Sequence, residues 1–567
     1  MNNARIKFIF FAFLIFGFFL LFKLFSWQVL KGDSLAKIAS SQHRTTNQLP
    51  AHRGVILSLD GFPLASSNEA WRVWASLPEL EKDIDKDIVA AKLVPLLISG
   101  EVEATESAKV KKEILLQEEE RLKTLFSKED SRWVPLKHKV SRDVKEKIEA
   151  LGISGIGFDL EESRTYPEAS MAAHLLGFVG KDEGGGDRGY FGLEGYYDLT
   201  LSGSSGRQTS EKDAFGNPII IGILNRIAAL NGLDIKTHID RSVQFILEKH
   251  LKEGLAKYGA SEGTIIVMRP QDGAILGMVS YPSFDPLKFS QTDQGLFGNP
   301  AVSGSFEPGS VFKVLVMASA LDADVIEPDS KCDQCSGPRR IAEYTLKTWN
   351  EKYYPDTTAT EIIQHSDNVG MIWVAEKLGA EKLYEYLQKF GIGTLTGIDL
   401  QGEANPELRS VDEWTSVDLA TAGFGQGIAL TPVQMLRAVG AIANSGRIVT
   451  PQVVDKIVGN GWEQDISPNR GQKVISEEAS RQITEMMVNA VEQGEAKWAK
   501  PKGFRIAGKT GTAQIPVSGH YDKEKTIASF VGFAPAHSPD SGQAAPKFVM
   551  LVTLREPQSS PWASETA

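Results

Sequence analysis

The chain has 567 residues and a net charge of −11, with 42% hydrophobic and 23% charged residues. At roughly 150 residues per domain, this length predicts three or four units, and the hydrophobic content is sufficient for ordinary buried cores. The acidic balance, without a compensating basic tract, argues against nucleic acid as a partner. The composition is that of an acidic globular protein with several domains.

The first 30 residues differ from the rest of the chain. Every residue from 8 to 22 is apolar, and the apolar stretch continues past Lys23. About 20 apolar residues span a bilayer, and this segment reaches that length if Lys23 extends its amine to the interface. Arg5 and Lys7 precede it, so the positive-inside rule predicts a cytoplasmic N-terminus with the remaining chain outside the cytoplasm. The alternative is a cleaved signal peptide, but no small-x-small site follows, which favours an uncleaved single-pass anchor over residues 1–30.

Residues 31–240 have the pattern of a β-rich, non-catalytic module. Arg53-Gly54 opens a short strand that turns at Asp60-Gly61 into a second strand. Residues 106–126 are rich in charge and predict a solvated amphipathic helix. The glycine-rich stretch over residues 181–206 is no phosphate loop, because no Gly-Lys-Ser or Gly-Lys-Thr closes it.

The sequence offers little for a metal centre. Its only cysteines, Cys332 and Cys335, form a C-x-x-C pair without the second Cys or His pair that a four-ligand zinc site needs. A disulfide between them would close a very short loop and add little stability, and a thioredoxin-like role would need a βαβ setting. We interpret the pair as local and structural, and His174 as a hydrogen-bonded structural histidine. No metal or cofactor is expected.

The character of the sequence changes near residue 240. Residues 241–258 predict a helix with one side on a core, because apolar residues recur at four-residue spacing. Residues 264–268 and 274–280 are apolar strands joined by a turn, which predicts a hairpin. Three more strands are expected at residues 505–514, 527–533 and 548–555. With the mostly helical middle, they predict a mixed α/β (α+β) domain over residues 241–567, with a central antiparallel sheet flanked by helices.

Residues 307–313, Glu-Pro-Gly-Ser-Val-Phe-Lys, place a serine where a loop becomes a helix. Pro308 and Gly309 break regular structure before Ser310, and the apolar residues after Lys313 predict a buried helix. Residues three apart share a helix face, so Lys313 can lie beside the Ser310 hydroxyl. Burial disfavours the ammonium form, so Lys313 can accept the serine proton near neutral pH. The Ser310 backbone N–H points to where an oxyanion would form.

A lone Ser-x-x-Lys motif is weak, since a second one runs from Ser34 to Lys37 with no reason to be catalytic. Two further motifs follow the first in order. They are Ser366-Asp367-Asn368 and Lys509-Thr510-Gly511-Thr512, and Lys-Thr-Gly occurs only once in the chain. The order of the three motifs therefore indicates a catalytic site, which a single motif would not.

The residue types of the first two motifs suit acyl transfer through a covalent serine ester. We expect Ser310 to attack, Lys313 to remove its proton, and Ser366 to relay that proton to the leaving amine. Asn368 offers an amide that can hold the substrate peptide bond.

The third motif suits the binding of a substrate carboxylate. Lys509 supplies positive charge, and Thr510 and Thr512, with Gly511 between them, supply hydroxyls. The backbone N–H of Thr512 would complete an oxyanion hole with that of Ser310.

This set of motifs resembles that of the penicillin-binding proteins. Four segments resemble the pedestal motifs of class B members: Arg53-Gly54, Arg164-x-Tyr166-Pro167, Gly192-Leu193-Glu194 and Thr237-x-x-Asp240. Gly425-Gln426-Gly427, followed by Thr431-Pro432 and Gln434, resembles a stretch of their transpeptidase domain. No glycosyltransferase module precedes the resemblance, so class A is not expected.

The resemblance implies a monofunctional D,D-transpeptidase that cross-links peptidoglycan stem peptides ending in D-Ala-D-Ala, with β-lactams acylating Ser310. It implies a pedestal (dimerisation-like) domain over residues 31–240 and a penicillin-binding transpeptidase domain over residues 241–567. It also implies a partner, a membrane glycosyltransferase of the shape, elongation, division and sporulation family. The enzyme would work at the outer face of the cytoplasmic membrane.

The chain departs from the family pattern at two places. Ser58-Leu59 stand where the first pedestal motif commonly carries an acidic-basic pair. The chain stops at residue 567, where the family would begin a C-terminal helix. We therefore expect a domain without that helix, with one sheet face exposed and a lower stability.

Two alternatives remain open at this point. The first is a serine β-lactamase, because residues 405–409 superficially resemble the loop that carries a deacylating glutamate, although Arg409 stands where that loop has asparagine. The large N-terminal module and the anchor fit a biosynthetic enzyme better. The second is a catalytically silent scaffold of the wall-synthesis complex, which would not need three intact motifs.

Overall fold

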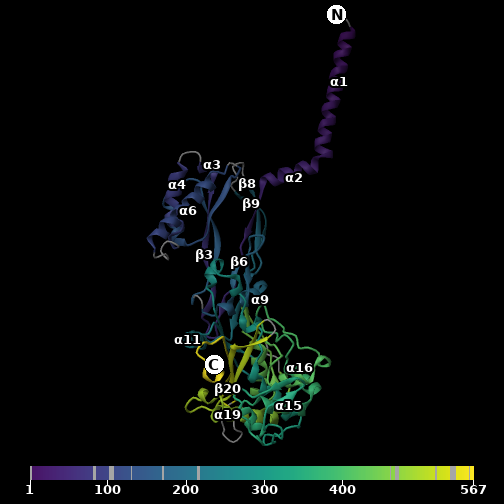
Figure 1. Ribbon diagram of the computed structural model, residues 1–567. Coiled ribbons are helices and arrows are strands. Elements are labelled where there is room, and N and C mark those ends of the chain that lie inside the picture. Colours follow the sequence, from purple (N-terminus) through teal and green to yellow (C-terminus); the bar gives the residue numbers. More distant parts are fainter. Residues whose placement is uncertain are drawn as a thin grey trace. The chain divides into compact units, whose positions relative to one another are not determined.

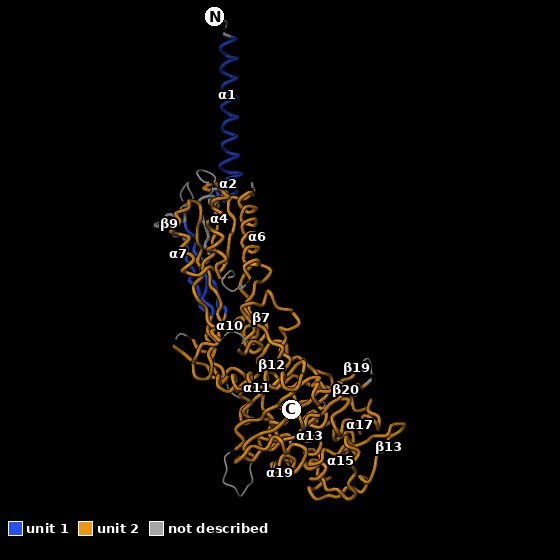
Figure 2. The backbone as a smooth tube through the Cα atoms, turned by 60° about the vertical axis from the view of Figure 1, so that its left-hand side comes forward, with its two compact units in different colours: residues 1–53, 202–232 blue, residues 54–201, 233–567 orange. Residues whose placement is uncertain are grey.

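The computed structural model of the chain describes residues 3–80, 85–100, 107–128, 130–168, 171–212, 218–459, 461–466, 471–517, 520–536, 545–560 and 562–566. It forms two compact units (Figure 2). One comprises residues 1–53 and 202–232, and the other residues 54–201 and 233–567.

The first unit begins with a long apolar helix (Figure 1). Helix α1 (Asn3–Phe25) continues as a π-helical turn, η1 (Ser26–Leu30). Residues Ala4–Leu30 are long and apolar enough to cross a membrane, by length and composition. This helix fits the predicted single-pass anchor. The unit also holds α2 (Gly32–His43) and an antiparallel sheet in the order β1-β8-β9, formed by β1 (Arg44–Leu49), β8 (Gly206–Lys212) and β9 (Pro218–Ile227).

The second unit contains a seven-stranded sheet in the order β17-β16-β10-β2-β3-β4, with β5 also paired to β3. Its strands are β2 (Ile56–Leu57), β3 (Pro63–Ser76), β4 (Trp133–Val140), β5 (Ile156–Thr165), β10 (Asp234–Thr237), β16 (Val454–Gly459) and β17 (Trp462–Asp465). The predicted strand pair is confirmed, because β2 and β3 are antiparallel with Ile56 opposite Ala65. Strands from both sides of residue 240 share this sheet.

Short helices and one hairpin complete this N-terminal part of the second unit. They are α3 (Leu77–Leu80), α4 (Lys86–Leu97), α6 (Ala108–Phe126), α7 (Arg142–Glu149), α8 (Ala173–Leu176), α9 (Gly192–Tyr196), α10 (Asp198–Ser202), β6 (Phe178–Lys181) and β7 (Asp187–Tyr190). The predicted charge-rich helix is α6, which lies beside α4 in both views (Figures 1 and 2). Leu122 and Phe126 on its inner face are buried with Leu93 of α4.

A buried ion pair joins three of the segments that resemble pedestal motifs. Arg164 Nε donates to Glu194 Oε1 at 2.7 Å, and both side chains are almost fully buried. Arg164 Nη1 also donates to the Gly54 carbonyl at 2.8 Å. Because a buried charge is costly without partners, the three segments are held to one another.

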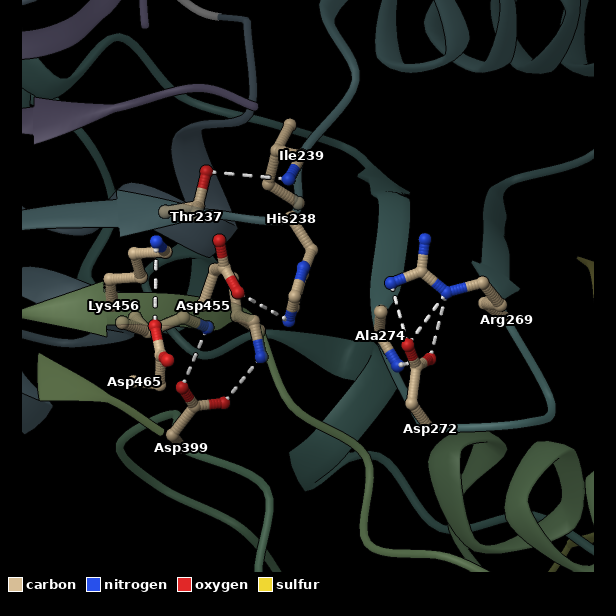
Figure 3. Close-up of polar contacts among 12 residues, drawn as sticks. Thr237, His238, Ile239, Arg269, Asp272, Ala274, Asp399, Asp455, Lys456 and Asp465 are labelled. Carbon is tan, nitrogen blue, oxygen red and sulfur yellow. Dashed lines mark hydrogen bonds and ion pairs between the residues drawn. The ribbon is translucent and has the colours of Figure 1, made fainter. Parts of the chain in front are cut away.

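A polar cluster lies where β10 meets β16 (Figure 3). His238 Nε2 is 3.9 Å from Asp455 Oδ1. Asp399 accepts the backbone N–H groups of residues 453 and 454 at 2.6 and 2.9 Å, and the Tyr197 hydroxyl donates to it at 3.0 Å. Burial raises the pKa of the Asp399 carboxyl, although these donors oppose the rise. The cluster thus connects β16 to the helical segment that follows Glu194.

The C-terminal part of the second unit is built on a five-stranded antiparallel sheet in the order β12-β11-β21-β20-β19. All five predicted strands are confirmed, as β11 (Glu262–Met268), β12 (Ile275–Tyr281), β19 (Ala507–Val517), β20 (His520–Ala534) and β21 (Phe548–Arg555). Strand β19, which carries the Lys-Thr-Gly motif, lies at an edge of the sheet.

Helices pack on both faces of this sheet, so the expectation of one exposed face is wrong, although Phe548, Met550 and Val552 of β21 are only partly buried. The helices are α11 (Arg241–Tyr258), α12 (Pro300–Ser303), α13 (Lys313–Asp322), α14 (Ala359–Gln364), α15 (Asn368–Leu378), α16 (Ala380–Lys389), α17 (Ser416–Ala422), α18 (Pro432–Ala443), α19 (Glu477–Glu492) and α20 (Ala563–Thr566). Side chains alternate along a strand, so Ile265 and Val267 pack with α11 while Ile266 and Met268 join the core that contains α13 and α18. The remaining elements are β13 (Arg339–Ile341), β14 (Tyr344–Leu346), β15 (Arg447–Ile448), β18 (Gln472–Lys473), η2 (Pro286–Gln291), η3 (Gln294–Leu296), η5 (Val411–Glu413) and η6 (Lys497–Ala499).

The cysteine pair and His174 have the local roles predicted for them. Cys332 and Cys335 form a disulfide, and both are buried. The ring of His174 makes a hydrogen bond through Nε2 to the Leu296 carbonyl at 3.0 Å and packs edge-on against Phe284. Burial lowers the pKa of His174, which favours the neutral ring.

Candidate active site

Ser310 lies in a 3₁₀ turn, η4 (Gly309–Phe312), that leads directly into helix α13. Lys313 is the first residue of α13, and every residue from Lys313 to Leu321 is buried. The predicted loop-to-helix position of the serine and the buried helix behind it are confirmed. Helices α15 and α19 pack on α13, so the turn rests on a rigid base.

Three glycines allow the backbone to pack closely around the Ser310 turn. Gly309 has φ +57° and donates its N–H to the Gly425 carbonyl at 3.0 Å. A Cβ on Gly425 would lie 2.2 Å from the Gly309 carbonyl oxygen, and one on Gly511 would lie 2.8 Å from a methyl of Val311. Strand β19 and the Gly-Gln-Gly loop therefore reach the turn only because these positions lack side chains.

The three motifs meet at the hydroxyl of Ser366. The Lys313 amine donates to the Ser366 carbonyl and to Asn368 Oδ1, each at 2.7 Å, and its nitrogen lies 3.3 Å from Ser366 Oγ. The Lys509 amine donates to Ser366 Oγ at 2.9 Å and to the Thr510 carbonyl at 3.0 Å. These hydrogen bonds direct the Lys313 amine to Ser366 and Asn368 rather than to Ser310.

Each residue of Ser366-Asp367-Asn368 has a distinct backbone or side-chain role. Ser366 adopts φ +56°, a left-handed conformation that is uncommon outside glycine and concentrates at functional sites. Asp367 is the N-cap of α15 and accepts the backbone N–H of Val369 at 2.9 Å. Asn368 Nδ2 donates to the Lys347 carbonyl at 3.1 Å, which fixes its amide.

Burial sets the charge of the two lysines. Desolvation lowers the pKa of Lys313 well below its usual range, and the neighbouring Lys509 lowers it further, while Asp367 opposes the shift. Desolvation also lowers the pKa of Lys509, to about 7, and Glu495 opposes that shift. Burial thus favours the neutral amine of Lys313, whereas Lys509 can carry a positive charge near neutral pH.

A surface cleft opens over these groups and is lined by Gly309, Ser310, Trp349, Ser366, Asn368, Phe424, Gln426, Glu495, Thr510, Thr512 and Trp562. Lys313 and Lys509 lie buried beneath it, and Gly511 packs below it against Val311. Every residue that the sequence predicted for the site is thus brought to one place. Thr512 Oγ1 already accepts the backbone N–H of Ala563 at 3.0 Å.

Several residues of the cleft carried no signal of their own in the sequence. Trp349 and Trp562 face each other at 5.1 Å between ring centroids, although they are far apart in the chain. Glu495 follows α19 outside any motif. Gln426, in contrast, belongs to the Gly-Gln-Gly segment that the sequence singled out, and Phe424 directly precedes that segment.

Comparisons with known proteins place this architecture in a family. Residues 263–567 match the family described as penicillin binding protein transpeptidase domain, and residues 48–237 match the penicillin-binding protein dimerisation domain. Stage V sporulation protein D of Bacillus subtilis is 32% identical over 520 residues, covering 90% of this chain and 76% of that protein. Peptidoglycan D,D-transpeptidase FtsI of Escherichia coli is 28% identical over 551 residues, covering 95% of this chain and 85% of that protein.

Solved structures agree with the sequence matches. Penicillin Binding Protein 2X from Streptococcus thermophilus has the same fold, with a TM-score of 0.71 at 23% identity over 91% of this chain and 78% of that one. A peptidoglycan synthetase from Bifidobacterium adolescentis gives a TM-score of 0.70 at 27% identity, over 92% and 94% of the two chains. The chain therefore belongs to the class B penicillin-binding proteins and carries their transpeptidase domain.

Proposed function

We propose that Ser310 is the nucleophile of a peptidoglycan D,D-transpeptidase, with Lys313, Ser366, Asn368 and Lys509 as the other catalytic residues. The observation that carries this assignment is the shared cleft, in which Ser310, Ser366 and the Lys-Thr-Gly strand line one surface above two buried amines. The substrates are stem peptides ending in D-Ala-D-Ala, and β-lactams acylate the same serine.

Acylation follows from these positions. Ser310 Oγ attacks the carbonyl carbon of the penultimate D-Ala, and its proton passes to the neutral Lys313 amine. The backbone N–H groups of Ser310 and Thr512 stabilise the oxyanion. The peptide bond then breaks, the leaving D-Ala amine takes a proton through Ser366, and an ester to Ser310 remains.

The edge strand β19 binds the donor peptide. An extended peptide can pair with the edge strand of a sheet, which orients its backbone. Lys509, Thr510 and Thr512, with Gly511 between them, bind the terminal carboxylate, and the Asn368 amide holds the peptide bond.

The two alternatives fit the molecule less well. In the loop that superficially resembles that of a β-lactamase, Arg409 pairs with Asp418, and Asn405 Oδ1 lies 3.5 Å from the side-chain amide of Gln434. These contacts tie the loop to helices α17 and α18, and its Glu407 is not among the described residues that line the cleft. A silent scaffold would have no need of two desolvated lysines beneath a serine-lined cleft, since burying amines without function is costly.

The remaining parts of the assignment concern location and partners. The N-terminal helix spans the cytoplasmic membrane once, with Arg5 and Lys7 on the cytoplasmic side and the rest of the chain outside. Residues 1–30 form the anchor, residues 31–240 the pedestal and residues 241–567 the transpeptidase domain. The pedestal works beside a membrane glycosyltransferase of the shape, elongation, division and sporulation family.

A transfer assay tests the enzymatic assignment. The full-length chain in detergent is incubated with N-benzoyl-D-alanyl thioglycolate, a thioester donor, and with D-alanine as acceptor. We expect the amide product to accumulate together with the hydrolysis product. Hydrolysis of donor and penicillin alone, without amide, would support a β-lactamase or carboxypeptidase, and no reaction of the folded chain would support the scaffold.

A further inference from the structure

Glu495 lies at the rim of the active-site cleft and is the one carboxylate among the described residues that line it. Its backbone N–H donates to the Gln364 carbonyl at 3.2 Å. Gly494 packs against the same carbonyl so closely that a Cβ there would lie 2.3 Å from the oxygen. The turn after α19 is therefore held in place, and with it the position of the carboxylate.

The carboxylate of Glu495 has no side-chain hydrogen bond or ion pair within the part of the chain that the structure describes. The side chain is half-buried. The Glu495 carboxylate raises the pKa of Lys509. The Lys509 amine nevertheless donates its hydrogen bonds to Ser366 and Thr510 rather than to Glu495. Among the described residues, the cleft thus presents a carboxylate that has no side-chain hydrogen bond, beside groups that otherwise suit an anionic donor.

A second surface pocket adjoins the cleft at the same residue. Glu495 and Thr510 line both. The second pocket also has one lysine, Lys257, whose amine donates to the Tyr258 hydroxyl at 2.9 Å, and a second carboxylate, Glu565. Glu495 therefore borders both the second pocket and the cleft that contains Ser310. Thr510 of β19 lines both, but Ser310 and Ser366 line only the cleft, so the second pocket can receive the other substrate.

We propose that Glu495 binds the cationic amine of the acceptor stem peptide and positions it against the acyl-enzyme. This inference rests on the proposed transpeptidase function. A carboxylate–ammonium hydrogen bond at a half-buried site is stronger than one between neutral groups, and it selects a charged amine over other nucleophiles.

The chemical step is balanced as follows. The ammonium held by Glu495 loses one proton to solvent, and its nitrogen attacks the carbonyl carbon of the Ser310 ester. A C–N bond forms and the C–Oγ bond breaks. The second proton of the nitrogen passes through Lys313 to Ser310 Oγ, which leaves an amide cross-link and the free serine.

The test measures how the acyl-enzyme divides between transfer and hydrolysis. Full-length chain in detergent is acylated with N-benzoyl-D-alanyl thioglycolate at about pH 7.5. It is offered D-alaninamide, which is largely cationic there, or hydroxylamine, which is neutral. The ratio of transfer to hydrolysis product does not depend on the acylation rate, so an effect of Glu495 on Lys509 during acylation cancels.

We expect Glu495→Gln to lower this ratio about 10- to 100-fold for D-alaninamide and far less for hydroxylamine. Glu495→Asp should recover part of the loss. The matched control is Glu492→Gln, because Glu492 lies on α19 with its carboxylate 4.0 Å from the Lys500 amine.

An equal loss for both amines, or no loss for D-alaninamide, would overturn the acceptor role of Glu495. Failure of the folded wild-type chain to form any acyl-enzyme would overturn the proposed function itself, and the inference with it. The two failures are therefore distinguished by the presence of the acyl-enzyme.

Discussion

The amines of Lys313 and Lys509 meet at one hydroxyl, at 3.3 and 2.9 Å from Ser366 Oγ. Both lysines are fully buried, and each positive charge disfavours the other. The site therefore favours one charged and one neutral amine, which are the states that carboxylate binding and proton removal require.

The coupling of the two lysines predicts a shift in the pH dependence of acylation. In Lys509→Gln the positive neighbour is gone, so the pKa of Lys313 should rise, and the fraction of neutral Lys313 at a given pH should fall. We expect slower acylation, with the acid limb of the rate profile displaced to higher pH. The acylation rate can be measured as a function of pH by stopped-flow mixing with a fluorescent penicillin. An acid limb at the same pH in Lys509→Gln and in the wild type would refute the coupling.

Burial of Lys509 predicts a pH-dependent stability. Its pKa is about 7 in the folded chain and about 10.4 in an unfolded one. Below pH about 7, Lys509 is protonated in both the folded and the unfolded chain, and the full cost of burying its charge is present. Between about pH 7 and 10.4, Lys509 is protonated only in the unfolded chain. The free energy of unfolding therefore rises with pH in this range. The Lys509→Met variant buries no ionisable amine at this position, so its stability does not include this cost. By calorimetry, the Tm of the variant minus the Tm of the wild type should be greatest near about pH 6 and should decline towards about pH 9.5. A difference in Tm that does not change with pH would contradict the account.

Gly425→Ala should reduce acylation about 100-fold, because its Cβ would lie 2.2 Å from the Gly309 carbonyl and displace the Ser310 turn. Gly427→Ala is the matched control. It also has a positive φ, +74°, but its Cβ would meet only the Thr421 hydroxyl, at 3.6 Å. Acylation kinetics of the two variants separate the clash from backbone strain, and equal losses would show that the clash is unimportant.

The Arg164–Glu194 ion pair predicts a strong single-mutant effect in the N-terminal part of the second unit. Arg164→Ala removes the guanidinium that donates to the buried Glu194 carboxylate, so we expect a loss of about 3–5 kcal/mol in the free energy of unfolding. Arg164→Met combined with Glu194→Gln should lose less, since the Glu194 charge is removed together with that of Arg164. Urea unfolding followed by tryptophan fluorescence compares them, and a double variant as unstable as Arg164→Ala would argue against this reason.

The parts of the fold that depend on local pattern could be predicted from the sequence. Short apolar runs on either side of a turn located the first two strands of the C-terminal sheet, and Pro308-Gly309 located the turn before Ser310. Motif order assembled the site residues. Contacts between distant segments could not be predicted in this way: β16 and β17 return to the sheet of β2 and β3, and neither strand has a motif.

The same limit applies within the site. Trp349, Glu495 and Trp562 reach the cleft from three separate segments, and single tryptophan or glutamate residues give no sequence signal of a site. The direction of the Lys313 amine was also beyond sequence spacing. Residues three apart share a helix face, but the left-handed backbone at Ser366 and the fixed amide of Asn368 draw the amine towards them.

The most direct test of the account is the intact mass of the full-length chain after incubation with benzylpenicillin. We predict a persistent adduct of one penicillin on the wild-type chain and none on Ser310→Ala. Ser34→Ala, in the other Ser-x-x-Lys segment, should retain the adduct. An adduct on Ser310→Ala, or its absence from a folded wild-type chain, would contradict the assignment of Ser310 as the nucleophile.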